Sequence, residues 1–248
     1  MHSLFGAKHI ILMCISLVLI VVFFLLSRKL KHRQILKIMF YVGLVAETLK
    51  VFYFTITNEA VYGGVLPKSD LPFHLCSIQI IFFAILNFTK NEKVEKYLNS
   101  FMLPSCLIGA FAAILLATYS SRNGNFVIAI EYFGYHSALV VYALHLIDSK
   151  EIKYEIKDYF CCLKFLVLII FFAFYINSIL YDGTSDINFM YVASPPQEGL
   201  PFLNENHGWV VYISHYAFLV ILGATLCYIK PIFKGLKSLK NKEKIAQN

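Results

Sequence analysis

Residues 9–27 read HIILMCISLVLIVVFFLLS, and residues 28–33 read RKLKHR. The first segment contains no Asp, Glu, Lys or Arg, and it has the length of about 20 residues that a helix needs to cross a bilayer. A cationic cluster follows it directly, with no small-residue cleavage pattern between them, which is typical of a span that is retained in the membrane. The segment therefore predicts a transmembrane helix.

The composition of the whole chain also indicates a membrane protein. Of its 248 residues, 58% are hydrophobic and 15% are charged, whereas charged residues make up about a quarter of an ordinary soluble domain. The net charge of +7 comes with no nucleic-acid-binding motif and no basic stripe on a soluble face, so we expect no nucleic-acid partner. Gly and Pro are dispersed, and we expect a single domain over residues 1–248 with a basic cytoplasmic tail from about residue 231.

Seven apolar segments are long enough to be membrane spans. They lie near residues 9–27, 35–57, 72–89, 98–118, 126–147, 159–181 and 209–230. The third is the shortest and starts at Pro72, a residue that suits the first position of a helix. The sequence thus predicts an all-α membrane protein, a bundle of seven transmembrane helices.

Lys and Arg gather in alternate connecting segments, as expected of cytoplasmic loops. The basic loops and the tail contain Arg28, Lys29, Lys31, Arg33, Lys37, Lys90, Lys93, Lys96, Lys150, Lys153, Lys157, Lys230, Lys234, Lys237, Lys240, Lys242 and Lys244. The loops of the opposite side contain only Lys8, Lys68 and Arg122. This alternation predicts a multi-pass protein of the cell membrane with its N-terminus outside and its C-terminus in the cytoplasm.

Polar side chains inside the predicted spans gather toward the outer side. Each ionisable group in a bilayer costs at least about 2.5–3.5 kcal/mol on insertion scales, so each is a candidate for function. At about 1.5 Å per residue from the outer helix end, Cys76, Asn177 and His215 lie about 6–9 Å deep. Glu47 and His136 lie about 15 Å deep on the same count. Because the inner half is nearly all Leu, Ile, Val and Phe, we expect a polar pocket that opens toward the outer leaflet or the outer aqueous face, and not a continuous channel.

Cys76, within LPFHLCS at residues 71–77, is the candidate nucleophile. A helix N-terminus or a neighbouring His activates a thiol, and Cys76 lies about one turn past the expected helix start. His74 would point to the opposite side of a regular helix, so His136 on the fifth span is the candidate base. Gln79, one turn below Cys76, is a candidate donor to an oxyanion.

Several of these residues also have a purely structural interpretation. His136 would then bond a helix carbonyl, and His215 would be an interfacial residue bonded to a loop. Glu47 and Lys50, spaced i and i+3, would form an ion pair that orders the second helix. His145 lies near the inner end of its span, where we expect it to meet water.

The other candidates have equally plain alternatives. Asn177 and Asn188 would cap or bridge helices, and Cys76 would form a disulfide with Cys106 if their Cα atoms are close. The spacing His74-x-Cys76 is not that of a zinc site, and we expect no metal and no cofactor. Packing is the expected role of the remaining cysteines, which are Cys14, Cys106, Cys161, Cys162 and Cys227.

Residues 71–77 resemble the Leu-Pro-Leu-His-Leu-Cys signature of the YwaF-like integral membrane proteins, whose animal relatives are cysteine-dependent phospholipid acyltransferases. Glu47 on the preceding span, YFGYHS at 132–137 and NFMY at 188–191 resemble further parts of that family in the same order. The likeness extends over roughly residues 40–215. It implies a membrane-embedded lipid acyltransferase, or transacylase.

The chemistry that the resemblance implies is acyl transfer through a thioester. Cys76 would attack an ester of a membrane phospholipid, and His136 would take the thiol proton and later activate the hydroxyl of a lysolipid. Residues available to orient the imidazole or to stabilise an oxyanion are Glu47, His74, Gln79, Asn177, Asn188 and His215. Membrane phospholipids and lysolipids are the expected substrates, and the oligomeric state is not predicted.

Three other functions compete with this hypothesis. A lipid hydrolase would use the same Cys–His pair with water as the acceptor. A small-molecule transporter is less favoured, because we find no internal repeat. A receptor, the third, is the least favoured. The absence of Lys between Trp209 and Ile229 excludes a retinal Schiff base there, and the Asp-Arg-Tyr and Asn-Pro-x-x-Tyr signatures of G-protein-coupled receptors are missing.

Overall fold

The computed structural model describes residues 5–57, 66–117, 126–149, 153–183, 187–196, 200, 202–203 and 208–246. All regular secondary structure within these residues is helical, which confirms the all-α prediction for them. The helices are α1 (Ala7–Ser27), α2 (His32–Thr57), α4 (Leu75–Phe88), α5 (Glu92–Pro104), α6 (Ala110–Leu115), α8 (Phe126–Asp148), α9 (Ile156–Leu180), α10 (Trp209–Cys227) and α11 (Ile229–Ala246). η1 (Lys68–Asp70) and η3 (Phe189–Tyr191) are single 3₁₀ turns, and η2 (Ser105–Gly109) is a π-helical segment between α5 and α6.

Five helices of the described chain are long and apolar enough to cross a membrane. They are α1, the continuous helix Glu92–Leu115 that joins α5, η2 and α6, and then α8, α9 and α10. α2 has 26 residues, but Arg33, Lys37, Glu47 and Lys50 lower its hydropathy. α4 has only 14 residues, fewer than the roughly 20 that a straight span needs. Each of the seven predicted segments nevertheless contains a helix.

α4 begins at Leu75, so the prediction that Pro72 is the first helical residue is wrong. His74 is the N-cap residue, with an extended backbone (φ −70°, ψ 151°). Residues 71–74 form a bend instead of a first helical turn. Cys76 is therefore the second residue of α4 and lies within its first turn.

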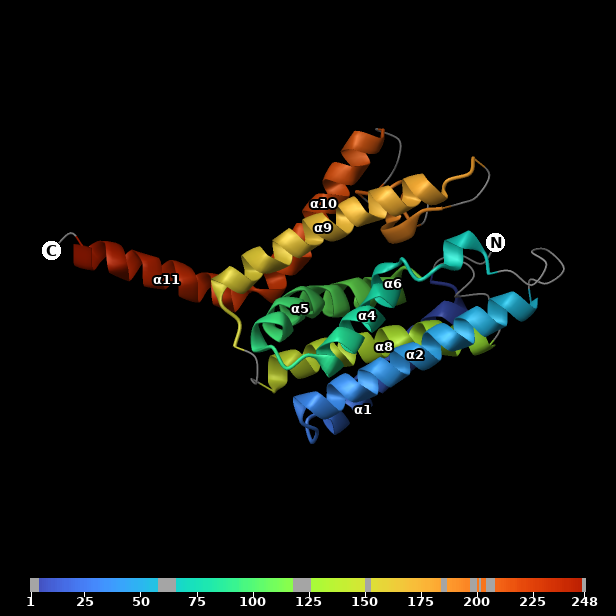
Figure 1. Ribbon diagram of the computed structural model, residues 1–248, viewed down its shortest axis with the longest axis horizontal. Coiled ribbons are helices and arrows are strands. Elements are labelled where there is room, and N and C mark those ends of the chain that lie inside the picture. Colours follow the sequence, from blue (N-terminus) through green and yellow to red (C-terminus); the bar gives the residue numbers. More distant parts are fainter. Residues whose placement is uncertain are drawn as a thin grey trace.

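The bundle is built around α8, which packs against α1, α2, α6 and η2. Gly43 permits a close approach of α2, because a Cβ there would lie 2.8 Å from Cγ1 of Ile80 and 3.2 Å from the Tyr135 hydroxyl. α9 and α10 lie on the other side of the bundle and pack against α5 (Figure 1). This arrangement places α4 next to both α2 and α5.

Helix α2 ends, and α4, α8 and α10 begin, at one end of the bundle, which we call the site end. We call the opposite end the basic end. Figure 1 shows η1 toward the site end, and α11 leading away from the basic end. The Lys-rich tail is thus helical. The basic loops and the site end lie at opposite ends of the helices.

The core at the basic end contains stacked imidazoles. His145 on α8 is only 2% exposed, so the prediction that it meets water is wrong. Its ring centroid lies 6.0 Å from that of His32 at the start of α2, with the planes 6° apart. His32 Nε2 in turn lies 3.2 Å from Glu95 Oε1. α8 turns His145 toward α2, which covers it.

Candidate functional site

Cys76 lies at the site end, in the first turn of α4. The amides of a first helical turn have no partner within the helix, and the Ser77 amide interacts with the Cys76 sulfur. The partial positive charge of a helix N-terminus also favours an anion at this position. Burial of the thiol opposes its ionisation, and the amides of this turn offset part of that cost by stabilising a thiolate on Cys76.

The position of Cys76 is fixed from two sides. Its carbonyl oxygen accepts a hydrogen bond of 3.0 Å from the Tyr135 hydroxyl of α8. Its side chain is half-buried and packs against the main hydrophobic core. Tyr135 itself is buried, so this contact anchors the start of α4 to the central helix.

An ion pair on α2 lies beside this turn. Lys50 Nζ is 2.8 Å from Glu47 Oε1, as the i and i+3 spacing predicts. The other carboxylate oxygen of Glu47 accepts a 3.1 Å hydrogen bond from the Ser77 hydroxyl. Glu47 therefore links the ion pair to the residue that follows Cys76.

Lys50 is the electrostatic centre of the site end. Its charge acts on five surrounding groups, which are Asp70, His74, Cys76, Glu131 and His136. We call Glu47, Lys50, Asp70 and Glu131 the charge cluster. Three carboxyl groups thus share one ammonium group in a largely covered region, where charges interact more strongly than in water.

Asp70 in η1 shows the effect of this environment. Burial raises the pKa of its carboxyl above the ordinary value, the Lys50 charge opposes that rise, and the Glu47 carboxylate adds to it. Desolvation therefore outweighs the attraction of the lysine at this residue.

His136 on α8 is 5% exposed and has a defined tautomer. Its Nδ1 lies 2.6 Å from the Tyr132 carbonyl oxygen, which is the helix-carbonyl bond that the structural interpretation predicts. Because a carbonyl only accepts hydrogen bonds, Nδ1 carries the hydrogen, and in the neutral ring Nε2 keeps its lone pair. His136 thus has a free basic nitrogen of the kind that a general base needs.

Cys76 and His136 share neighbours without touching. The charges of Lys50 and Glu131 act on both residues. Among the described residues, no hydrogen bond joins the Cys76 sulfur to the ring of His136 or of His74. A proton transfer between them therefore requires a movement of these side chains or a bridging water.

His74 faces the η3 turn. Its ring centroid lies 5.0 Å from that of Phe189, edge to face, and 5.9 Å from that of Tyr191. Phe73 also packs against Phe189, with centroids 5.5 Å apart. The η3 turn therefore covers the entry into α4.

Both predicted asparagines hold this cover in place. Asn177 on α9 donates to the Phe189 carbonyl (3.2 Å) and accepts from the Phe189 amide (2.9 Å). Asn188 donates to the Ser194 carbonyl and hydroxyl, both at 2.8 Å, and accepts from the Ala193 amide at 3.1 Å. Asn177 thus has the bridging role, between α9 and η3. The bonds of Asn188 stay within residues 188–194, so it neither caps nor bridges helices.

α10 supports the same turn from outside. The Tyr216 hydroxyl donates to the Met190 carbonyl at 2.9 Å, and the Tyr212 hydroxyl donates to the Tyr191 carbonyl. Met190 and Tyr191 have positive φ angles of 58° and 54°, a conformation that costs energy for a non-glycine residue. The contacts from α9 and α10 offset this cost and keep η3 over α4.

Gln79 and His215 are engaged away from the charge cluster. Gln79 is buried, and its Nε2 donates a 2.9 Å hydrogen bond to Ser105 Oγ in η2. The Ser105 hydroxyl in turn donates a 2.9 Å hydrogen bond to the Phe101 carbonyl oxygen. His215 is exposed, and its Nδ1 lies 3.0 Å from the Phe202 carbonyl oxygen, which matches the loop-bonded interpretation.

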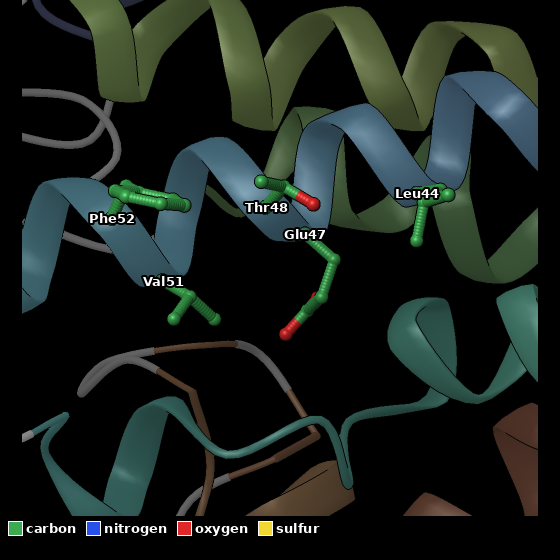
Figure 2. Close-up of a pocket in the computed structure, with 5 residues that line it drawn as sticks. All are labelled: Leu44, Glu47, Thr48, Val51 and Phe52. Carbon is green, nitrogen blue, oxygen red and sulfur yellow. The ribbon is translucent and has the colours of Figure 1, made fainter.

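A pocket of about 290 Å³ opens on the surface of α2 (Figure 2). It is lined by Leu44, Glu47, Thr48, Val51 and Phe52. Figure 2 shows Glu47 and Val51 pointing to the same side of α2, away from α8. The pocket therefore reaches the side of α2 that meets α4.

The described residues form neither a disulfide nor a cluster of side chains suited to a metal ion. All six cysteines, including Cys76 and Cys106, are free, so the alternative disulfide does not form. No group of three or more His, Cys, Asp or Glu residues suited to a metal ion occurs in the part of the chain that the structure describes.

Two contacts of the site were not foreseen from the sequence. Asp70 lies just before the predicted third span, where no rule marks a carboxyl as buried. Tyr135 precedes His136 on the fifth span, and its hydroxyl was a usable signal, because a buried tyrosine normally has a hydrogen-bond partner.

Comparison with curated proteins and with solved structures finds no match. Residues 4–228 match the TMEM164 family. This range contains every helix from α1 to α10 and all the candidate site residues. The chain therefore belongs to the TMEM164 family of membrane proteins.

Proposed function

We propose that this protein is a membrane-embedded lipid acyltransferase that forms an acyl-thioester on Cys76. The observation that carries the proposal is the place of Cys76 in the first turn of α4, with its sulfur at the Ser77 amide and the Glu47–Lys50 pair beside it. A thiol at a helix N-terminus is a suitable nucleophile. The resemblance of residues 71–77 to the YwaF-like proteins favours the same chemistry.

The first half-reaction transfers an acyl group to the enzyme. His136 Nε2 takes the Cys76 proton, directly or through one water, and the thiolate attacks the ester carbonyl of a phospholipid. The acyl C–O bond breaks, and the leaving alcohol oxygen takes the proton from the imidazolium. Free amides in the first turn of α4 are available to the oxyanion. The products are the Cys76 thioester and a lysolipid.

The second half-reaction regenerates the thiol. The hydroxyl of an acceptor lysolipid gives its proton to His136 and attacks the thioester, the C–S bond breaks, and the sulfur takes the proton back. A new ester is the product. With water as the acceptor the same steps release a fatty acid, so hydrolysis is the natural side reaction.

We propose further that all seven helical segments cross the membrane, with the N-terminus outside and the site facing the outer leaflet. The Lys and Arg distribution supports this orientation, because the basic loops gather at the basic end. The Glu47–Lys50 pair lowers the cost of placing α2 in the bilayer, since the two charges offset each other. The test uses an impermeant thiol reagent on intact cells. We expect it to label a cysteine introduced at Lys68 and not one introduced at Lys237. The reverse result would refute the orientation.

The activity is tested with the purified protein in nanodiscs that contain phospholipid with a labelled acyl chain. Added lysolipid should become labelled, Cys76→Ala should abolish the transfer, and Cys14→Ala should leave it unchanged, because Cys14 is exposed on α1. His136→Gln should slow acylation by about 10²–10⁴-fold. Full transfer by Cys76→Ala would exclude the covalent mechanism, and labelled fatty acid without labelled lipid would identify a hydrolase.

A further inference from the structure

The pocket lies on the outward surface of α2, on the side of the bundle. Two of its lining side chains, Leu44 and Phe52, are 46% and 63% exposed. Val45 and Leu49 on the same helix are also exposed apolar residues. In a protein that spans a bilayer such a surface faces hydrocarbon, so the mouth of the pocket faces lipid chains.

One residue that lines the pocket contacts the turn that carries the candidate nucleophile. Glu47 is the single charged residue of the five that line it, and its carboxylate bonds to the Ser77 hydroxyl and to Lys50. Ser77 follows Cys76 and offers its amide to the Cys76 sulfur. Glu47 therefore joins the pocket to the residue that follows Cys76 in the sequence.

We propose that this pocket binds one acyl chain of the membrane lipid that reacts at Cys76, so that the lipid enters from the side of α2. This inference rests on the function proposed above. The pocket extends along α2 from Leu44 to Phe52, a length of about 12 Å at about 1.5 Å per residue. The chain lies against Leu44, Val51 and Phe52, and its ester end reaches the Glu47–Ser77 contact.

An acyl chain fits the pocket better than a headgroup does. Four of the lining residues carry no charge, and a phosphate would meet the carboxylate of Glu47. The volume of about 290 Å³ suits part of a lipid, because sites for whole small ligands usually range from about 300 to 1,000 Å³. The rest of the lipid stays in the bilayer.

The test fills the pocket and follows lipid contact without relying on turnover. Thr48→Trp is the blocking variant, because Thr48 is an exposed lining residue. Val45→Trp is the matched control, on the same helix, 58% exposed and outside the lining. Each is combined with Cys76→Ala in nanodiscs that contain a phosphatidylcholine with a diazirine in its acyl chain. Irradiation should label residues 44–52 in Cys76→Ala alone and with Val45→Trp, and about tenfold less with Thr48→Trp.

Equal labelling of these residues in the two tryptophan variants, or none in either, would overturn the proposal. A crosslinked pair of chains joined through α2 would overturn it as well, because a second copy would then occupy the pocket.

A second readout separates this proposal from the proposed function. With Cys76 present, Thr48→Trp should lower acylation by a long-chain phospholipid about tenfold or more and leave acetylation by p-nitrophenyl acetate unchanged. Unchanged long-chain acylation would refute the entrance and keep the acyltransferase. Lipid labelling of the pocket without any acylation of Cys76 would keep the lipid site and refute the acyltransferase.

Discussion

The hydroxyl of Tyr135 donates a 3.0 Å hydrogen bond to the carbonyl oxygen of Cys76. A buried side chain of the central helix α8 thus fixes the turn that carries the candidate nucleophile. Loss of one hydrogen bond costs about 1 kcal/mol, so Tyr135→Phe should fold and should acylate Cys76 several-fold more slowly. Tyr132→Phe is the control, because the Tyr132 hydroxyl bonds the Ala113 carbonyl at a similar 3.0 Å. Equal acylation rates in both variants would show that the Tyr135 contact has no positioning role.

Gly43 should be sensitive to the smallest substitution. A Cβ there would lie 2.8 Å from Ile80 and 3.2 Å from the Tyr135 hydroxyl, so Gly43→Ala should destabilise the fold by about 1–3 kcal/mol. Gly134→Ala on α8 should be neutral or stabilising, because nothing lies within 4 Å of its Cβ position. Thermal unfolding in detergent compares the two. A midpoint for Gly43→Ala as high as that for Gly134→Ala would contradict the close packing of α2, α4 and α8.

Asn177 should control how firmly η3 covers the start of α4. Asn177→Leu loses both hydrogen bonds to Phe189, each worth about 1 kcal/mol. Amide exchange in residues 187–196 should therefore become faster. Asn177→Asp keeps an acceptor for the Phe189 amide and should show a smaller effect. Exchange as slow in Asn177→Leu as in the unchanged protein would mean that α10 alone holds η3.

The free energy of unfolding should depend on pH through the carboxyl group of Asp70. Burial raises the pKa of this carboxyl, so the folded protein holds the proton more tightly than the unfolded chain does. This contribution to stability is complete below the ordinary value of 3.8 and is lost as pH rises through the pKa of the folded state. Asp70→Asn does not titrate and should gain stability relative to the unchanged protein as pH rises from about 3.5 to neutral. A stability difference that stays constant over this range would refute the shift.

The helices were largely predictable from the sequence, because apolar length is a local property. Residues 9–27 and 126–147 correspond closely to α1 and α8. The start of α4 was not predictable, since Pro72 is compatible with a first helical turn. Its extended N-cap residue His74 packs against η3, a contact between segments far apart in the chain.

The candidate site was only partly predictable, because depth along a helix does not give the direction of a side chain. The depth estimate placed Glu47 and Cys76 on one side of the membrane, and the structure joins Glu47 to Ser77 next to Cys76. Depth does not show toward which neighbouring helix a side chain points. Gln79 turns toward η2 and His215 toward Phe202.

The central claim is that Cys76 carries an acyl group during turnover. The most direct test is mass spectrometry of the peptide that contains Cys76, after the protein in nanodiscs meets phospholipid with a labelled chain and no acceptor. The account predicts the labelled acyl mass on Cys76, removable by neutral hydroxylamine and retained in Cys106→Ala. An unmodified Cys76 in folded protein, or a label on another cysteine alone, would contradict it.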